Sequence, residues 1–416
     1  MAKSEKRIVF GLILSCWLIY TFSMCMKMAY SGAMASIKEE YGVSHVTASL
    51  PITLYYSFYA VIQFGLAIFM SRINFKLYMA ITFIISGLSF ISVFFYSPMW
   101  YIGTVLALNG ITLGAVWCGS VSVFGKYLSQ RTMNNALLFM GIGFSAGSAM
   151  SYVVNAIAAA VGNWRIGFIV FGVAFLLATL YFLFALTRAE KAGIKPKAEN
   201  VAIKKQVYKA EKVDVKPLII MAIIITFFAC VLYYGLTNWM PTILSNIFQM
   251  SNANSNLITT IFPVVAYVGP VLVVILCNRL KNDFLVSLIG CGISALFGLL
   301  LYLLLDVNVI LTVFIIIVWG ISLRAVNSLC GSLCSLHTRE YVDAGKTSAI
   351  INAVACIAAA VSPFLISMIL DASGNEWSVG FLVLFIFAVV MLVISVVFLI
   401  IREINRRKLK GSDNVA

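Results

Sequence analysis

Two basic side chains, Lys27 and Arg324, lie within long hydrophobic stretches of the sequence. Arg324 is near the centre of its stretch, too far from either end to reach water, because a helix rises only ~1.5 Å per residue. An ionised side chain at mid-bilayer depth costs about 2.5–3.5 kcal/mol or more, so it usually faces a cavity and has a function. A guanidinium fork suits a carboxylate or a phosphate. The two cations predict an anion site, with snorkelling of Lys27 to the nearer interface as the alternative.

The other charged and polar residues support an anion site. All fifteen acidic residues fall in expected loops or at expected helix ends, so the sequence offers no buried carboxylate partner for either cation. Spacings of three, four and seven residues place further side chains on the same helix faces. On the face of Lys27 these are Tyr20, Ser23, Tyr30, Ser31 and Met34, and on the face of Arg324 they are Gly320, Asn327, Ser328 and Gly331. Hydroxyls, amides and rings around a cation suit a small anion with an organic body.

Membrane-spanning helices must position these residues. Hydrophobic residues make up 62% of the chain and charged residues 11%, with a mean hydropathy of +1.02, values outside the range of soluble domains. A span needs about 20 apolar residues, so the pattern predicts an all-α membrane protein with twelve transmembrane helices. The expected spans are 8–35, 45–70, 77–97, 99–124, 134–160, 164–187, 217–244, 255–277, 283–305, 308–335, 346–370 and 378–401. The first is too long for a signal-peptide core, and we expect it to remain in the mature protein.

The basic residues predict the orientation of the chain. With the N-terminus inside, the inner loops carry residues such as Arg72, Lys126 and Arg279, whereas the outer loops carry only Lys38 and Arg165. Both termini are therefore expected to be cytoplasmic. The formal net charge of +14 then reflects topology and attraction to anionic lipid headgroups, and not nucleic-acid binding. We expect a monomeric, multi-pass protein of the cytoplasmic membrane.

Neither a metal, a cofactor nor an enzymatic site is expected. The nine cysteines lie in or at the edges of spans, where they behave as small hydrophobes. Cys330 and Cys334 are four residues apart on one helix face, but they lack a nearby His or carboxylate and make a poor metal site. His45 and His337 lie at helix ends, and no acid–base or nucleophilic constellation can be assembled.

A charged segment after the sixth span divides the expected spans six and six. The sequence predicts an N-terminal six-helix bundle, a basic cytoplasmic linker, a C-terminal six-helix bundle and a cytoplasmic tail. These are residues 1–187, 188–216, 217–403 and 404–416.

The two bundles have the character of repeats. Met70-Ser71-Arg72 follows the second span as Cys277-Asn278-Arg279 follows the eighth. The two segments are 207 residues apart, and the same offset relates Lys27 to Tyr234 and Trp117 to Arg324. Parallel repeats of this kind are typical of secondary transporters, with the substrate site near the midplane.

With its six plus six helices, basic linker and short loops after spans 2 and 8, the chain resembles the major facilitator superfamily. The family's motif after span 2 is degenerate here, since only Arg72 and Lys76 of it are kept. The segment Gly235-Leu236-Thr237-Asn238-Trp239-Met240-Pro241-Thr242 is similar to the organic-anion and organophosphate antiporter branches. Tyr234 departs from the organophosphate antiporters, which carry a basic residue in span 7. The resemblance implies that spans 1, 4, 7 and 10 line a central cavity, which places Lys27 and Arg324 in it.

These observations predict a secondary transporter that moves a small organic anion, a mono- or dicarboxylate, by alternating access and as an antiporter. The expected substrate-binding residues are Lys27, Arg324, Tyr20, Ser23, Tyr30, Trp117, Tyr234, Asn238 and Asn327. Ordinary packing or interface anchoring is the alternative for Trp117, Tyr234 and Asn238. Two other functions stay open: export of apolar compounds, favoured by many aromatic and Met residues, and a non-transporting sensor that uses the same fold.

Overall fold

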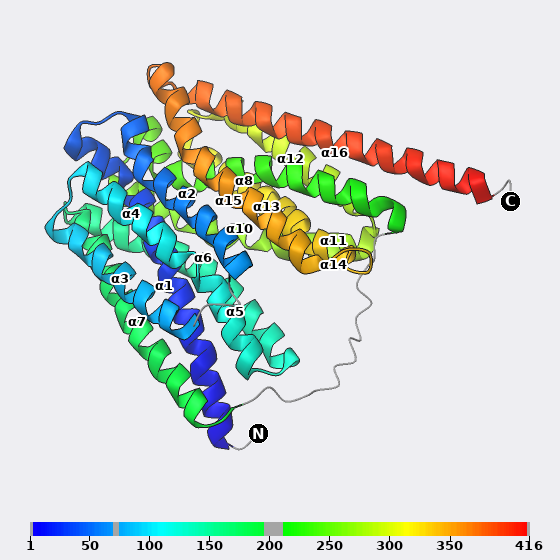
Figure 1. Cartoon of the computed structure of the whole chain (residues 1–416). Helices are drawn as coiled ribbons and strands as arrows, with labels where there is room; N and C mark the ends of the chain where they lie inside the picture. The colour runs from blue at the N-terminus through cyan, green and yellow to red at the C-terminus, as the bar shows by residue number, and fades with distance from the viewer. Residues whose placement is uncertain (1–2, 70–74, 195–210, 414–416) are drawn as a thin grey trace. The chain divides into compact units, whose positions relative to one another are not determined.

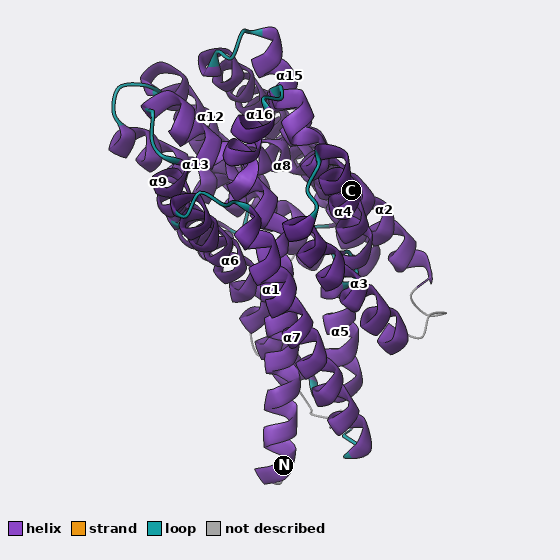
Figure 2. Cartoon of the chain, turned by 90° about the vertical axis from the view of Figure 1, so that its left-hand side faces the viewer, coloured by secondary structure: helices purple, strands orange, loops and turns teal. Residues whose placement is uncertain are grey.

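The computed structural model describes residues 3–69, 75–194 and 211–413. Within these ranges every regular element is helical and no strand occurs (Figure 2). This follows from the composition, because a helix satisfies its backbone groups within the segment and is one of the two structures that can cross hydrocarbon. Arg72 and linker residues 195–210 lie outside the described residues.

Packing divides the chain into two compact units, and each unit is described here by itself. Unit 1 comprises residues Met1–Lys204 and Met250–Pro263, and unit 2 comprises Lys205–Gln249 and Val264–Ala416. The domain boundaries read from the sequence stay a prediction.

In unit 1, the long helix α1 packs against α6 and α7 (Figure 1). Helix α2 packs against α4, and α3 packs against α7 and α4. The helix that begins span 8, α9, also packs against α6. The helices of unit 1 are α1 (Lys3–Tyr41), α2 (His45–Phe69), α3 (Phe75–Phe95), α4 (Met99–Leu113), α5 (Val116–Tyr127), α6 (Gln130–Ala160), α7 (Arg165–Lys191) and α9 (Asn252–Thr259).

In unit 2, α8 packs against α15, α16 and α13, while α12 packs against α16 and α13. The chain passes from unit 1 to unit 2 within α10 (Ile261–Ala266). The helices of unit 2 are α8 (Lys212–Phe248), α11 (Val268–Leu280), α12 (Asp283–Leu304), α13 (Val309–Ser328), a π-helical turn (Leu329–Leu333), α14 (Cys334–His337), α15 (Ala344–Ala372) and α16 (Trp377–Asp413).

Among the described residues, eleven helical segments are long and apolar enough to cross a membrane. The remaining expected span is present as the helix α2, with 25 residues. Large hydrophobic side chains are exposed on these helices, with Ile310 80% and Phe95 76% exposed. Such surfaces are unfavourable in water and match a hydrocarbon solvent. The expectation of an all-helical membrane protein is confirmed.

Three of the expected spans are interrupted. Span 4 breaks at Gly114 and Ala115, between α4 and α5. Span 8 breaks at Thr260 and at Tyr267, three residues before Pro263 and Pro270. Proline removes one backbone N–H donor and its ring clashes with the preceding turn, which explains both breaks in span 8. The interruption of span 10 is the π-helical turn after α13.

Pairs of acidic and basic side chains connect helix ends inside each unit. In unit 1, Arg165 pairs with Glu40 and Lys76 pairs with Glu190. In unit 2 the pairs are buried: Nδ1 of His337 lies 2.8 Å from Oδ2 of Asp283, and Nε of Arg402 lies 3.2 Å from Oδ2 of Asp214. The two aspartates are at helix ends, as the sequence predicted, but the sequence did not predict their burial or their partners.

Candidate anion site

Lys27 is buried in unit 1, where its side chain is 5% exposed. Its Nζ lies 4.9 Å from the ring centroid of Tyr56 and 5.6 Å from that of Tyr59, both on α2. The face of an aromatic ring attracts a cation, by about 2 kcal/mol when the pair is desolvated. The two phenol rings therefore help α1 to carry a positive charge away from water without cancelling it.

The residues expected around Lys27 divide into two groups. Tyr20 lies in a ring contact with Trp117 of α5, with centroids 5.2 Å apart, so two expected site residues from different helices meet. In contrast, Tyr30 is fully buried and its hydroxyl donates to the carbonyl of Ala48. Ser23 is also fully buried and donates to the carbonyl of Tyr20, 2.7 Å away. These bonds tie Tyr30 to α2 and Ser23 to its own helix.

Gln63, which sequence spacing did not single out, lies between the tyrosine rings beneath Lys27 and the segment that carries Trp117. Gln63 of α2 donates from Nε2 to the hydroxyl of Tyr59 at 3.2 Å and to the carbonyl oxygen of Gly114 at 2.8 Å. The thiol of Cys118 donates to Oε1 of Gln63, with the two atoms 3.6 Å apart. Gln63 thus links the ring beneath Lys27 to the break in span 4, beside Trp117.

Arg324 occupies a comparable setting in unit 2. Its side chain is half-buried, and its guanidinium carbon lies 5.2 Å from the ring centroid of Tyr233 on α8. Asn327, one turn later on α13, donates from Nδ2 to Sγ of Cys230 at 3.1 Å. The packing of α11 is close here, because a Cβ added to Gly269 would lie 3.2 Å from Cβ of Arg324. Arg324 therefore has an aromatic neighbour from α8 and tight backbone packing from α11.

The two remaining expected residues belong to α8. Tyr234 is half-buried, contacts the ring of Tyr233 at 5.7 Å between centroids, and packs beside Val231 and Ala358. Asn238 is fully buried one turn further along the helix. Both lie in unit 2 with Arg324, whereas the ring that contacts the guanidinium is that of Tyr233.

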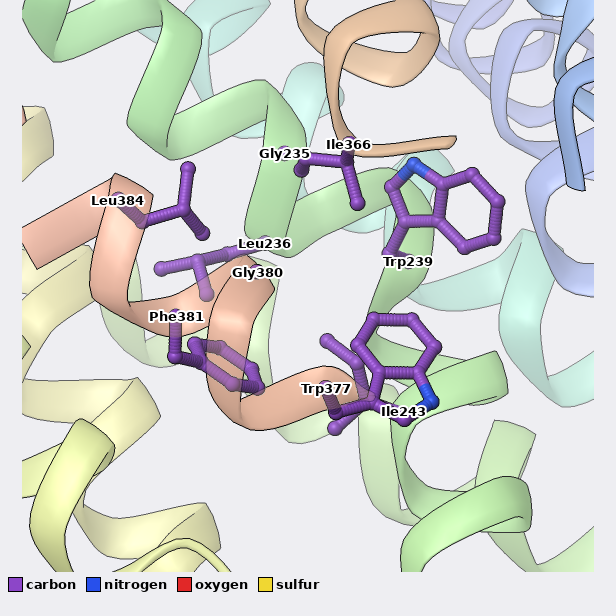
Figure 3. A pocket seen from close by; sticks show the side chains of 9 residues that line it. All are labelled: Gly235, Leu236, Trp239, Ile243, Ile366, Trp377, Gly380, Phe381 and Leu384. Atoms are coloured by element: carbon purple, nitrogen blue, oxygen red, sulfur yellow. The ribbon is translucent and has the colours of Figure 1, made fainter. Parts of the chain in front are cut away.

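Unit 2 also has an apolar pocket that contains neither Arg324 nor an ionisable side chain. The indoles of Trp239 and Trp377 lie at one side of it, with Ile366 and Leu384 among the aliphatic walls (Figure 3). The lining residues come from α8, α15 and α16, and are Gly235, Leu236, Trp239, Ile243, Ile366, Trp377, Gly380, Phe381 and Leu384. The pocket is therefore suited to an apolar group, and neither Lys27 nor Arg324 lines it.

No group of three or more His, Cys, Asp or Glu side chains in the described part of the chain could hold a metal ion. Cys330 and Cys334 are both free and buried. The arrangement therefore offers two cations, each over tyrosine rings, and polar side chains near them. Within its own unit, each cation can attract an anion, and the rings and amides beside it can contact an organic group.

Comparison with known proteins decides the family. A family model described as Major Facilitator Superfamily matches residues 16–344 and 224–415. The chain belongs to the major facilitator superfamily. No curated protein matches it.

Solved structures of transporters share this facilitator fold. A bacterial homologue of the human lysosomal transporter Spinster, in an inward-facing and occupied conformation, is 15% identical with a TM-score of 0.73, covering 94% of this chain and 96% of that one. The D-xylose–proton symporter is 15% identical, with a TM-score of 0.71 and coverage of 94% and 97%. The nucleoside transporter NupG is 12% identical, with a TM-score of 0.69 and coverage of 93% and 99%. These identities establish the fold of a multi-pass membrane transporter and do not extend to a substrate.

Proposed function

We propose that this facilitator carries a small organic anion, a mono- or dicarboxylate, and that it exchanges one anion for another by alternating access. The observation that supports this is the placing of Lys27 and Arg324. Each is a cation well inside a hydrophobic span, and each lies over the ring of a tyrosine from a neighbouring helix. Maintaining a charge at such a depth is costly, so we propose that the site uses it on the substrate.

The two cations have different chemistry in this proposal. Arg324 has a planar fork that can hold both oxygens of a carboxylate, and Asn327 on the same helix face adds an amide. Lys27 is a compact charge on a flexible stem, and the rings of Tyr56 and Tyr59 restrict where its ammonium can lie. Arg324 would therefore orient a carboxylate, while Lys27 would supply charge and attraction over a broader range of positions.

The test is anion exchange in proteoliposomes that contain the full chain. The assay compares wild type with Arg324→Gln, Arg324→Lys and Lys27→Gln, using small mono- and dicarboxylates as substrates. Loss of a charged hydrogen-bonding partner is worth about 1.5–3 kcal/mol, which is roughly a 10- to 100-fold loss in affinity. We expect Arg324→Gln to lose exchange, and Arg324→Lys to keep part of it with a raised KM, because the charge remains without the fork.

A matched control is Lys126→Gln. The Nζ of Lys126 also lies over a tyrosine, 5.2 Å from the ring centroid of Tyr127, but the lysine is exposed at the end of α5. Removing it should leave exchange unchanged. Undiminished exchange in both Arg324→Gln and Lys27→Gln would overturn the proposal.

Export of apolar compounds is the second candidate, and the apolar pocket of unit 2 favours it. This function would depend on Trp239 and Trp377 and not on the two cations. Resistance profiling of a strain that overproduces Trp239→Ala or Arg324→Gln separates the candidates. Resistance that is lost with the tryptophan and kept without the arginine would favour export.

A further inference from the structure

The break in span 4 leaves backbone groups that need partners from outside the helix. Where α4 ends, the carbonyl of Gly114 accepts from the side chain of Gln63, with 2.8 Å between Nε2 and the oxygen. An unpaired carbonyl in hydrocarbon costs several kcal/mol, so a donor at this position helps the break to persist. The donor comes from α2, the helix that also carries Tyr56 and Tyr59.

The amide of Gln63 makes two further hydrogen bonds, one to a residue of α2 and one to a residue of α5. Nε2 donates to the hydroxyl of Tyr59, and Oε1 accepts from the thiol of Cys118 on α5. Both ends of the Gln63 amide are therefore engaged, and they join α2, the end of α4 and the start of α5. A side chain bonded in this way has little freedom to turn, so the atoms that it contacts are held in one arrangement.

The packing of α2 on span 4 makes this connection stiff. A Cβ added to Gly110 would collide with the carbonyl of Tyr55 and lie 3.1 Å from the backbone N of Tyr59. A Cβ added to Gly114 would lie 3.0 Å from Cγ2 of Ile62. The backbones of α2 and α4 thus approach closely at Gly110, and the side chain of Ile62, next to Gln63, packs against Gly114. This tight packing leaves little space for span 4 to shift without moving the part of α2 that carries Tyr59 and Gln63.

The two ends of the network reach residues of the proposed anion site. At one end, the ring of Tyr59 lies beneath the Nζ of Lys27. At the other end, Cys118 directly follows Trp117, whose ring contacts Tyr20 on α1. Gln63 is itself half-buried. It contacts Tyr59, which lies beneath Lys27, and Cys118, which follows Trp117.

We propose that Gln63 is a positioning residue for anion recognition: it fixes the Tyr59 ring under Lys27 and holds the span 4 break beside Trp117. This inference rests on the proposed function, because the effect is expressed as anion affinity through Lys27. It predicts that removal of the amide weakens binding of the anion while the turnover of bound anion is largely kept.

The experiment uses Gln63→Met, which has a similar length but lacks the hydrogen bonds. We expect a KM for anion exchange raised by about tenfold, the effect of roughly one hydrogen bond, with kcat within about twofold of wild type. In a Lys27→Gln background the same substitution should give no further rise in KM, because its effect passes through Lys27. An additive rise in the double variant, or an unchanged KM in the single variant, would overturn the inference.

Asn109→Leu serves as the matched structural control. Asn109 is a buried amide that also joins two helices of unit 1, since it bonds to Ser86 and Ser89 of α3 from α4. Loss of this tie should reduce thermal stability without a selective rise in KM. If both variants raise KM equally, the effect of Gln63 is general loosening of the unit, and the positioning role is wrong.

A readout that does not use an anion separates this inference from the proposed function. Alkylation of Cys118 by N-ethylmaleimide, followed by mass spectrometry of its peptide, should be several-fold faster in Gln63→Met, because the thiol loses its acceptor. If wild type exchanges no organic anion, the proposed function fails, and an unchanged labelling rate would then overturn the role of Gln63 as well. Faster labelling together with normal KM would leave Gln63 as a structural residue only and contradict the inference.

Discussion

Asn256 donates a hydrogen bond from its side-chain nitrogen to the carbonyl oxygen of Gly32, across 2.9 Å. The first residue lies on α9 and the second on α1, so this bond fixes the start of span 8 on unit 1. Gly32 is required at the contact: an added Cβ would lie 2.6 Å from Nδ2 of Asn155 and 2.8 Å from Oδ1 of Asn256. The two amides and the glycine backbone form a closely packed seat for α9, which we call the α9 seat.

Gly32→Ala should disturb the α9 seat. Overpacking of a tight contact costs about 1–3 kcal/mol, because a neighbouring side chain or backbone must move. We expect a lower Tm in detergent and a changed exchange rate, because α9 cannot dock in the same way. Gly125→Ala is the control, since a Cβ there meets nothing within 4 Å. Equal behaviour of the two alanine variants would contradict the close packing at Gly32.

Asp283→Asn should destabilise unit 2 through the loss of the buried pair with His337. The side chains of His337 and Asp283 are 3% and 1% exposed. The change replaces the carboxylate beside Nδ1 of His337 by a neutral amide, and a hydrogen bond to a charged group is worth about 1.5–3 kcal/mol. The measurement is the Tm of the purified protein.

The control for that change is Glu211→Gln, in which the carboxylate pairs with Arg406 but is 62% exposed. An exposed pair contributes only about 0–1 kcal/mol, so we expect almost no shift. If the Tm of Asp283→Asn equalled that of Glu211→Gln, the pair of Asp283 with His337 would not contribute to stability.

Replacement of both Pro263 and Pro270 by Ala should make span 8 a more continuous helix. Each proline follows a helix break by three residues, and the chain passes from unit 1 to unit 2 between Pro263 and Val264. With both prolines removed, the missing N–H donors return and bending at this place becomes harder. We expect slower exchange with unchanged affinity for the anion.

Pro98→Ala is the matched control for the span 8 prolines. Pro98 is the N-cap residue of α4 and lies before that helix, so its loss should affect no helix interior. A drop in exchange of the same size in this control, or normal exchange in the double variant, would be evidence against a hinge at the two prolines.

Lys27 and Arg324 could be found from the sequence, because a charge within a hydrophobic span is conspicuous without any structure. Their ring partners could not be found in this way. Spacing along one helix identifies side chains on the same face, whereas Tyr56, Tyr59 and Tyr233 lie on other helices. Tyr56 and Tyr59 stand in span 2, and no spacing rule places that pair beneath Lys27 of span 1.

Tyr30 shows the opposite difficulty. It stands three residues after Lys27 and shares its helix face, yet its hydroxyl bonds to the carbonyl of Ala48. Membership of a face does not say whether that part of the face meets a neighbouring helix or a cavity. Similarly, the breaks of span 8 could be predicted from its prolines. The break of span 4 has no proline, and the Gln63 side chain that bonds to its Gly114 carbonyl comes from another helix.

The α9 seat has a consequence for how the polypeptide could be divided. If the chain were cut in the linker after α7, the N-terminal fragment would lack residues 250–263, which complete its packing. Expressed alone, that fragment would leave the carbonyl of Gly32 without its hydrogen-bond donor Asn256. Coexpressed with the C-terminal fragment, it would recover α9 from the other polypeptide. Because unit 1 includes residues 250–263 from beyond the linker, we expect the N-terminal fragment to fold stably only when both fragments are coexpressed.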